Sequence, residues 1–495
     1  MQRSSGILLP VFSLPSRGGI GAFGKEAYDF IDFLHAAGQR YWQLLPLGPT
    51  SFGDSPYQSF SAYAGNPYFI DLTLLLEDGL LTEKEIAALT PPDGGVVDYA
   101  AIYQTRFPLL SLASERGLKR DAEALTRFCA ENETWLPDFA LFMALKGHFG
   151  MRAWSEWEDE DIRLRKPAVL AAYRARLAPE IRRICYLQYL FFKQYNALRA
   201  YAHQKGVSIL GDLPIYVAMD SADVWSAPQN FLLDENLEPI AVSGVPPDDF
   251  SAAGQRWGNP LYRWEDMQQN GYAWWRARIR GARKLYDIIR IDHFRGFASY
   301  WSVDAAEADA THGVWVKGPG LELVKALCEA AEGMEIIAED LGYLDESVRS
   351  LLHDSGFPGM KVIEFAFDSR EPGNYLPHTY PQNCVCYVGT HDNPPVMAWR
   401  QEAAAEDVRF AEEYLGLNEA EGFHLGMIRG GMSSVAVLFV AQMQDWLGLG
   451  ADSRTNIPST LGGNWKWRLD KGALTPKLAQ KIRRMSYIYG RIDQP

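Results

Sequence analysis

The sequence predicts an α/β fold, a (β/α)8 TIM barrel that spans residues 1–495 as a single catalytic unit and carries large, mostly helical insertions. Two observations lead to this prediction. Eight short apolar runs recur along the chain, mostly separated by stretches with helical spacing, which is the pattern of a parallel sheet wrapped by helices. Four of these runs end in a carboxylate, as strands do at the catalytic face of a barrel enzyme.

The predicted strands are short apolar runs, most of them bounded by glycine, proline or charge. They cover residues 6–14, 41–47, 207–210, 288–291, 335–338, 360–365, 384–388 and 435–441. The helices predicted around the barrel cover 25–37, 184–205, 272–286, 321–331, 344–354, 396–415 and 477–489.

A barrel of this kind needs about 250 residues, so the remaining chain is predicted to form insertions. The first covers about 48–183 and contains helical patches at 82–89, 118–132 and 136–149, too much sequence for one loop. The second covers about 214–262 and is rich in loops, which suggests a lid or substrate-binding loop.

The four carboxylates at strand ends are Asp212, Asp292, Glu339 and Asp392. Side chains two apart on a strand share a face, so Arg290 is expected to lie beside Asp292. A guanidinium within about 4–6 Å lowers a carboxylate pKa by roughly 1–3 units, which predicts that Asp292 stays ionised. Taken alone, this pair could equally be a structural ion pair at a strand end.

The composition limits the partners that the chain can have. With 48 basic and 62 acidic residues the net charge is −14, which argues against nucleic-acid and anionic-membrane partners. The start of the chain lacks the pattern of a signal peptide, and no apolar run reaches the length of a transmembrane helix. Five cysteines without a Cys-x-x-Cys motif indicate buried thiols in a reducing compartment. A cytoplasmic enzyme without a zinc site is therefore expected.

A glycine motif, Gly19-x-Gly21-x-x-Gly24, resembles a dinucleotide-binding fingerprint because it follows a predicted strand and precedes a predicted helix. The next predicted strand, at 41–47, ends without the acidic residue that would bind a ribose, and no Walker-type motif occurs. The sequence is therefore predicted to need no cofactor.

The strand-end carboxylates suit cleavage of a glycosidic bond. This reaction needs one carboxylic acid to protonate the leaving oxygen and one carboxylate to meet the sugar carbon, roughly 5–5.5 Å apart in a retaining enzyme. Asp292 and Glu339 end consecutive predicted strands, which lie about 4.8 Å apart. We predict Asp292 as the nucleophile and Glu339 as the acid and base, with a pKa raised by the like charges of Asp292 and Asp392. Asp392, with His391 beside it, is better suited to bind sugar hydroxyls.

The same segments resemble the motifs of the 4-α-glucanotransferases (amylomaltases or disproportionating enzymes), which form glycoside hydrolase family 77 in the α-amylase clan. The similar segments occur in order along the whole chain. They are Ser-Pro-Tyr-Gln-Ser-Phe-Ser-Ala-Tyr-Ala-Gly-Asn-Pro at 55–67, Gly-Asp-Leu-Pro-Ile-Tyr-Val at 211–217, Gly-Val-Pro-Pro-Asp at 244–248, Gly-Gln-Arg-Trp-Gly-Asn-Pro-Leu-Tyr at 254–262, Arg-Ile-Asp-His-Phe-Arg-Gly at 290–296, Ile-Ile-Ala-Glu-Asp-Leu-Gly at 336–342 and Gly-Thr-His-Asp-Asn at 389–393.

The resemblance implies Asp292 as nucleophile, Glu339 as acid and base, and Asp392 as a stabiliser of the transition state. It also implies a barrel without a C-terminal β-sandwich domain and a reaction between an α-1,4-glucan donor and a glucose or maltooligosaccharide acceptor. The sugar contacts that it implies are Ser55, Tyr57, Asp212, Trp257, Arg290, His391 and Asn464. From the residues alone, Tyr57 and Trp257 could be packing aromatics, Asp212 a cap and Asn464 a turn residue.

Three other functions remain open at this point. An α-1,4-glucan hydrolase would use the same carboxylates, and transfer requires an acceptor held in a site that disfavours water. The stretch 243–262, with Pro246, Pro247, Phe250 and Trp257, is a candidate lid for this purpose. A metal-dependent hydrolase could use His293 and His391 with Asp292 and Asp392, but no metal-binding motif of known spacing occurs. A glucan-binding module without catalysis is the third.

Overall fold

A computed structural model describes residues 1–89, 95–247, 251–342, 344–368 and 375–492. Its centre is a sheet of eight parallel strands in the order β10-β11-β12-β1-β2-β3-β6-β9. The backbone N–H of Ala338 at the end of β9 donates to the carbonyl of Pro358 just before β10, at 3.0 Å, and this bond joins the two outer strands. The sheet is therefore the predicted barrel.

The eight strands overlap the eight predicted ones. They are β1 (Ser4–Leu8), β2 (Tyr41–Gln43), β3 (Ser208–Leu213), β6 (Ile288–Ile291), β9 (Glu335–Ala338), β10 (Gly359–Val362), β11 (Cys384–Tyr387) and β12 (Leu438–Gln442). The first strand ends earlier than predicted because Pro10, which has no N–H for a ladder, begins a 3₁₀ turn at Val11–Ser13.

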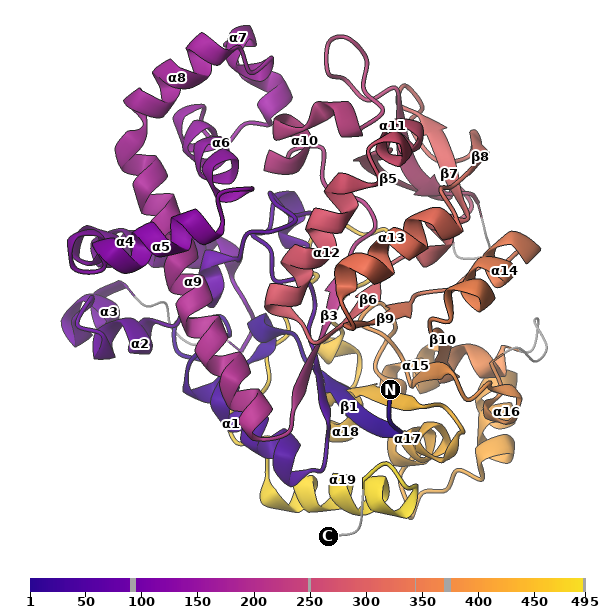
Figure 1. Cartoon of the computed structure of the whole chain (residues 1–495). Coiled ribbons are helices and arrows are strands. Elements are labelled where there is room, and N and C mark those ends of the chain that lie inside the picture. The colour runs from indigo at the N-terminus through magenta and orange to yellow at the C-terminus, as the bar shows by residue number, and fades with distance from the viewer. Residues whose placement is uncertain (90–94, 248–250, 343, 369–374, 493–495) are drawn as a thin grey trace.

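Helices surround the barrel on the outside (Figure 1). Those that correspond to predicted helices are α1 (Lys25–Ala36), α9 (Ala178–Gln204), α12 (Ala273–Leu285), α13 (Leu321–Ala331), α14 (Glu346–Ser355), α15 (Val396–Glu402), α16 (Ala405–Leu415) and α19 (Pro476–Ile488), and the chain adds α17 (Phe423–Ser433) and α18 (Met443–Leu447). The single helix predicted over 396–415 is two helices, because Ala403 and Ala404 have extended backbone angles.

The first insertion is helical, as expected. It holds α2 (Leu72–Glu77), α3 (Glu83–Leu89), α4 (Tyr99–Arg120), α5 (Ala122–Glu131), α6 (Leu136–His148), α7 (Glu160–Arg163) and α8 (Pro167–Arg176). In Figure 1 most of these helices stand to one side of the barrel, next to the long α9. The predicted helix over 118–132 is divided at Asp121, whose carboxylate binds Arg120 and the hydroxyl of Tyr186.

The second insertion is not only loops. It contains α10 (Ala222–Ser226) and two strands, β4 (Ala241–Val245) and β5 (Gln255–Pro260), and α11 (Trp264–Gln269) follows it. These strands form an antiparallel sheet with β7 (Ser299–Asp304) and β8 (Gly313–Lys317), in the order β5-β4-β7-β8. The second sheet thus joins the insertion after β3 to the connection after β6. Residues 248–250 of the predicted lid lie outside the described residues.

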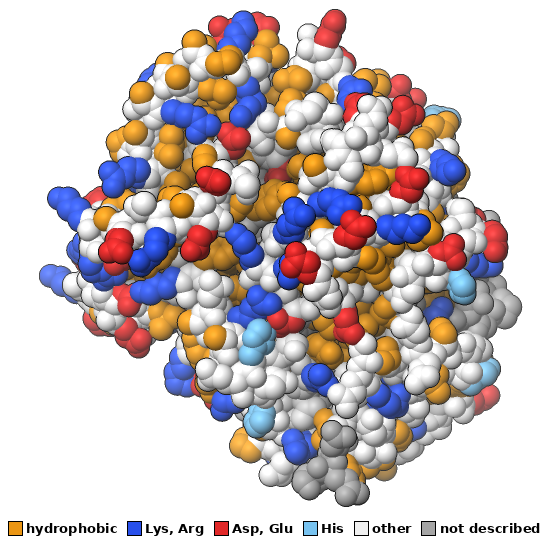
Figure 2. Space-filling model, viewed as in Figure 1, with side chains coloured by type: hydrophobic (Ala, Val, Ile, Leu, Met, Phe, Trp, Pro, Cys, Tyr) orange, Lys and Arg blue, Asp and Glu red, His pale blue; other side chains and the backbone are white. Residues whose placement is uncertain are grey.

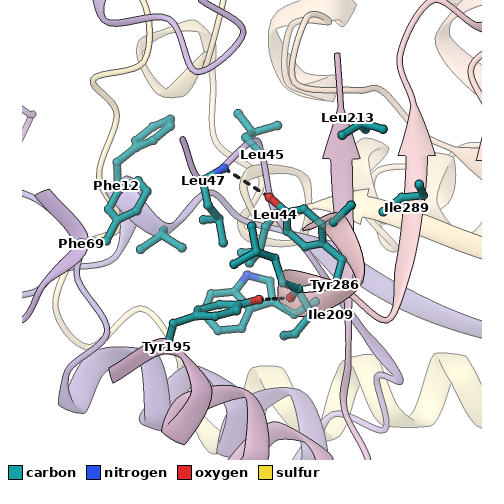
Figure 3. Close-up of a cluster of buried hydrophobic side chains, with 14 of the residues drawn as sticks. Phe12, Leu44, Leu45, Leu47, Phe69, Tyr195, Ile209, Leu213, Tyr286 and Ile289 are labelled. Atoms are coloured by element: carbon teal, nitrogen blue, oxygen red, sulfur yellow. Dashed lines mark hydrogen bonds between the residues drawn. The ribbon is translucent and has the colours of Figure 1, made fainter. Parts of the chain in front are cut away.

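Two apolar layers hold the barrel. Inside it, every strand contributes side chains to one buried cluster: Leu8, Tyr41, Leu210, Ile288, Ile337, Met360, Val362, Val385, Tyr387, Leu438 and Val440. Outside it, Leu44, Ile209 and Ile289 pack against the surrounding helices, where the Tyr286 hydroxyl accepts from the backbone N–H of Leu47 (Figure 3). This packing on both faces fixes the strands whose ends carry the carboxylates.

The outer surface shows acidic and basic side chains interspersed on the face drawn in Figure 2. No helix among the described residues is long and apolar enough to span a membrane.

Candidate active site

The strand-end carboxylates meet at one end of the barrel. Asp212 on β3 is in register with Arg290 on β6, and Ile291 on β6 is in register with Ala338 on β9. Asp292 and Glu339 follow directly on these last two residues, where the Glu339 N–H donates to the Ile291 carbonyl at 3.0 Å. The two carboxylates therefore leave adjacent strands at the same level, as the sequence predicts.

Arg290 joins two of the carboxylates. Its Nε and Nη2 donate to the two carboxylate oxygens of Asp212 at 2.9 and 2.7 Å, and Nη2 also donates to Asp292 Oδ1 at 2.9 Å. The side chain of Arg290 is 3% exposed and that of Asp212 fully buried, whereas that of Asp292 is 30% exposed. The predicted pair of Arg290 and Asp292 is confirmed, and its exposed member is the candidate nucleophile.

The pKa of Asp292 differs from the prediction. Burial raises this pKa well above the usual value; Arg290 lowers it, and the like charges of Asp212, Glu339 and Asp392 raise it again. The expected net direction is wrong: Arg290 lowers the Asp292 pKa as predicted, but burial and the neighbouring carboxylates outweigh this effect.

Glu339 is held by backbone groups. Its carboxylate oxygens accept from the N–H of His293 at 2.7 Å and of Leu341 at 2.8 Å. His293 reaches it from a left-handed backbone conformation with φ 53°, which non-glycine residues seldom adopt and which is common at functional sites. Burial raises the pKa of Glu339, with Asp340 adding to the rise and Arg290 and the two N–H groups opposing it. The predicted direction is right, but the main cause is burial.

The charge of Glu339 is one of the influences that raise the pKa of Asp292, so the protonation of one carboxyl affects the other. Arg290 contacts Asp292 directly and so favours the negative charge there. The N–H groups of His293 and Leu341 favour a negative charge on Glu339.

Asp392 behaves differently. Its Oδ1 accepts from the Asn456 amide at 2.6 Å, and its Oδ2 lies 3.3 Å from Nε2 of His391. Burial raises the pKa of Asp392, but His391, Asn456 and Arg290 outweigh this effect and lower it to about 2. Asp392 therefore remains a carboxylate at any ordinary pH, with a side chain that is 46% exposed.

An aromatic stack flanks Asp392. The rings of Tyr57 and His391 are stacked at 5.1 Å, and Trp465 lies 5.9 Å from Tyr57. The Tyr57 hydroxyl donates to Asp212 Oδ2 at 2.6 Å, which connects the stack to Arg290. Ser55 supports this arrangement, since its hydroxyl accepts from the Tyr57 N–H at 3.3 Å.

The other two predicted sugar contacts lie on separate segments. Trp257 on β5 packs edge-on against His293 at 4.8 Å, which brings the second sheet to the catalytic carboxylates. Asn464 instead binds its own loop: its Oδ1 accepts from Ile457 at 3.0 Å and its amide donates to Thr460. In this arrangement Asn464 shapes the loop, and a role in sugar binding stays a prediction.

Sequence reasoning missed Asn456, Trp465 and the backbone N–H of His293. The prediction of Asn464 did identify the loop that contributes Trp465, since Trp465 is the next residue. Nothing in the local sequence indicates Asn456, which is 64 positions from the carboxylate that it contacts. Among the described residues, no group of three or more His, Cys, Asp or Glu side chains is arranged to hold a metal ion.

Comparisons with known proteins agree with this geometry. The family model described as 4-alpha-glucanotransferase, glycoside hydrolase family 77, matches residues 9–475. The chain belongs to this family. The 4-alpha-glucanotransferase of Clostridium butyricum is 48% identical over 98% of this chain and 100% of its own length. That of Solanum tuberosum, described as chloroplastic/amyloplastic, is 41% identical over 99% of this chain and 87% of its own.

Among solved structures, the amylomaltase of Streptococcus agalactiae in complex with acarbose is 43% identical and superimposes with a TM-score of 0.97. The match covers 99% of this chain and 100% of that one, so the family's barrel is shared over its whole length.

The Arg290 bridge leads to a first prediction. Arg290→Lys is expected to lower kcat about 10²-fold and to lower Tm, since a lysine ammonium cannot bind both oxygens of Asp212 and still reach Asp292. Steady-state kinetics and thermal unfolding measure the two effects. Arg199→Lys is the matched control, because Arg199 pairs with Asp287 away from the site, and it should leave kcat unchanged. An Arg290→Lys protein with wild-type kcat would contradict the bridge's role.

Proposed function

We propose that the protein is a retaining transglycosylase that moves α-1,4-glucan segments from a donor to the 4-hydroxyl of an acceptor glucan or glucose. The observation that carries this proposal is the adjacent pair of Asp292 and Glu339 with their unequal partners, in a member of the 4-α-glucanotransferase family. The family gives the substrate class, and the pair gives the chemistry.

In the first step, the Asp292 carboxylate attacks C1 of the donor sugar as the bond from C1 to the glycosidic oxygen breaks. Glu339 gives its proton to that oxygen, which leaves as the 4-hydroxyl of the released glucan. The product is a glycosyl ester on Asp292. Asp392, with a pKa of about 2, keeps the negative charge needed near the cationic sugar carbon and its hydroxyls.

In the second step, Glu339 is a carboxylate and takes the proton of an acceptor 4-hydroxyl. The acceptor oxygen bonds to C1 as the ester bond to Asp292 breaks, and both carboxyl groups return to their starting states. The Arg290 contact supports Asp292 in both directions, because it stabilises the carboxylate as attacking and as leaving group.

Water could also take the second step, which would make the protein an α-1,4-glucan hydrolase. Water is near 55 M, so transfer requires an acceptor that is bound in place of water. The second sheet favours transfer, since it brings Trp257 against His293 beside the carboxylates and offers an acceptor sugar an apolar surface. Tyr57 and its stack offer another such surface near Asp392.

The test is incubation with maltotriose alone. Transfer is expected to give glucose together with oligomers longer than maltotriose, whereas hydrolysis gives only shorter sugars. Resolution of the products by chain length decides between them, with Glu339→Gln as the inactive control. A product mixture without any oligomer above maltotriose would contradict the transferase proposal, and activity lost on EDTA treatment would favour a metal-dependent hydrolase.

A further inference from the structure

Two buried carboxyl groups, those of Glu364 and Asp445, lie close to the segment that carries Asp392. Glu364 follows β10 and is 4% exposed, and Asp445 lies on α18 and is 1% exposed. Within the described part of the chain, neither carboxylate oxygen of Glu364 nor Oδ2 of Asp445 has a partner at hydrogen-bonding geometry. Buried, unpartnered carboxylate oxygens are costly to keep, so this arrangement calls for a physical reason.

Glu364 contacts the turn formed by Thr390–Asn393. The Glu364 N–H donates to the Val388 carbonyl at 3.2 Å, and a Cβ built on Gly389 would lie 3.0 Å from its Oε1. A side chain at residue 389 would crowd the carboxyl group, so the glycine leaves room for it. The Asn393 amide is close enough to Glu364 to lower its pKa.

From Asn393 a series of bonds leads to Asp392. Asn393 Oδ1 accepts from the N–H and from the hydroxyl of Thr390, both at 2.9 Å. The Thr390 hydroxyl oxygen in turn accepts from the Asp392 N–H at 3.3 Å. Asp445 holds the other end of the segment, since its Oδ1 accepts from the Val396 N–H at 2.8 Å.

The charged groups that face the pair come from other elements. The charges of Asp445 and Glu402 raise the pKa of Glu364, and the charge of Arg454 lowers it. Arg454 also donates to the Asp392 carbonyl at 3.1 Å and pairs with Glu402 at 3.4 Å. Arg454, the cation that lowers the pKa of Glu364, is thus already bound to other groups.

Glu364 and Asp445 are buried, and little positive charge is available to stabilise their ionised forms, so both carboxyls tend to retain their protons. Burial raises the pKa of Glu364 well above its usual value, with Asp445 adding to the rise, and burial raises the pKa of Asp445 to about 7. The raised pKa favours the uncharged form of Glu364, which can fill the space beside the turn without an unpaired charge.

We propose that Glu364 and Asp445 are positioning residues. They support the Thr390–Asn393 turn from the protein interior and so place the Asp392 carboxylate for the transglycosylation proposed above. Neither touches the sugar. Both act through the turn, and Glu364 acts in its protonated form.

Two substitutions of Glu364 test this. Glu364→Gln keeps the shape of the uncharged carboxyl and is expected to stay within about threefold of wild-type kcat. Glu364→Ala removes the support and is expected to lower kcat at least tenfold, while KM for maltotriose changes less than threefold, since Asp392 acts mainly in the transition state. Asp71→Asn, a buried carboxyl that caps α2 outside the site, is the matched control and should change neither constant.

Glu364→Gln keeps the result decisive even if Glu364→Ala does not fold. A tenfold loss of kcat in Glu364→Gln would mean that Glu364 acts as a charged group, for example toward a bound cation, and would overturn the proposal. An effect of Glu364→Ala on KM alone would overturn it too.

The route through Asp392 is tested on an Asp392→Asn background. There Glu364→Ala is expected to cost less than threefold in addition, because residues that act through one group are not additive. Full additivity would overturn the route. A maltotriose product pattern without longer oligomers in wild type would refute the proposed transferase function but would leave this test of positioning intact.

The protonation of Asp445 in the buried pair with Glu364 is tested by measuring Tm as a function of pH. Because the folded state raises the pKa of Asp445 to about 7, its stability contribution is lost as pH rises from about 4 to about 7. Asp445→Asn removes this loss, so its Tm relative to wild type should rise by about 2–4 °C over that range. A constant difference would overturn the part of the proposal in which these buried carboxyls hold protons.

Discussion

Asp292→Asn is expected to lower kcat for transfer by about 10⁴- to 10⁶-fold, with the fold retained. An amide oxygen is a poor nucleophile, so no glycosyl ester can form. The side chain keeps the size and one acceptor for Arg290, which donates to Oδ1 at 2.9 Å, and therefore the site should remain assembled. Initial rates with maltotriose, and circular dichroism as a check on folding, measure the effect.

The control for this prediction is glucan binding. Asp292→Asn should still bind maltooligosaccharides in a calorimetric titration, which also separates an enzyme from a binding module. A variant that transfers glucose units at more than about 1% of the wild-type rate would exclude Asp292 as nucleophile.

Glu339→Gln is expected to lower kcat by about 10²- to 10⁴-fold for a glucan donor, because the leaving 4-hydroxyl then receives no proton. The loss in kcat/KM, which reports the first step, should be much smaller with α-glucosyl fluoride as donor, since fluoride leaves without protonation. The comparison of the two donors measures the acid role directly, whereas a residue that only shapes the site would impair both equally.

The pH profile gives the second measurement for Glu339. Its pKa is raised by burial, so wild-type kcat/KM should fall on the alkaline side only above the usual range of a glutamic acid. With the fluoride donor, Glu339→Gln should lose this alkaline fall in the glycosylation step. Persistence of the same fall in the variant would assign it to another group.

The barrel and its carboxylates could be predicted because the relevant information is local. Each strand is a short apolar run, and Asp292 and Glu339 stand directly after two of them. Parallel strands in a barrel end at one face, so residues far apart in sequence are brought together by topology alone. The motif from Arg290 onwards therefore predicts both the barrel and the candidate catalytic pair.

Other features depend on pairings that no local pattern contains. The sequence did not show how deeply Asp292 would be buried among other carboxylates, and this burial, with the like charges of Asp212, Glu339 and Asp392, outweighs Arg290 and raises the Asp292 pKa. The contact of Asn456 with Asp392 likewise forms only when a loop after β12 folds over the end of β11.

The second sheet was missed for a related reason. β4, Ala241–Val245, has the sequence Ala-Val-Ser-Gly-Val, which shows no clear alternation, and one of its two partners is β7, more than 50 positions later. Such a strand is specified mainly by its partners.

The order β5-β4-β7-β8 sets a rule for engineering acceptor preference. If residues 241–260 were exchanged for a homologous loop, the new segment would stay in place only if its β4 pairs with β7. Without that pairing, β7 (Ser299–Asp304) would present unpaired backbone donors and acceptors at a sheet edge. Residues 241–260 and 299–317 should therefore be exchanged together, although β6, which Asp292 follows directly, lies between them in the sequence and would not be exchanged.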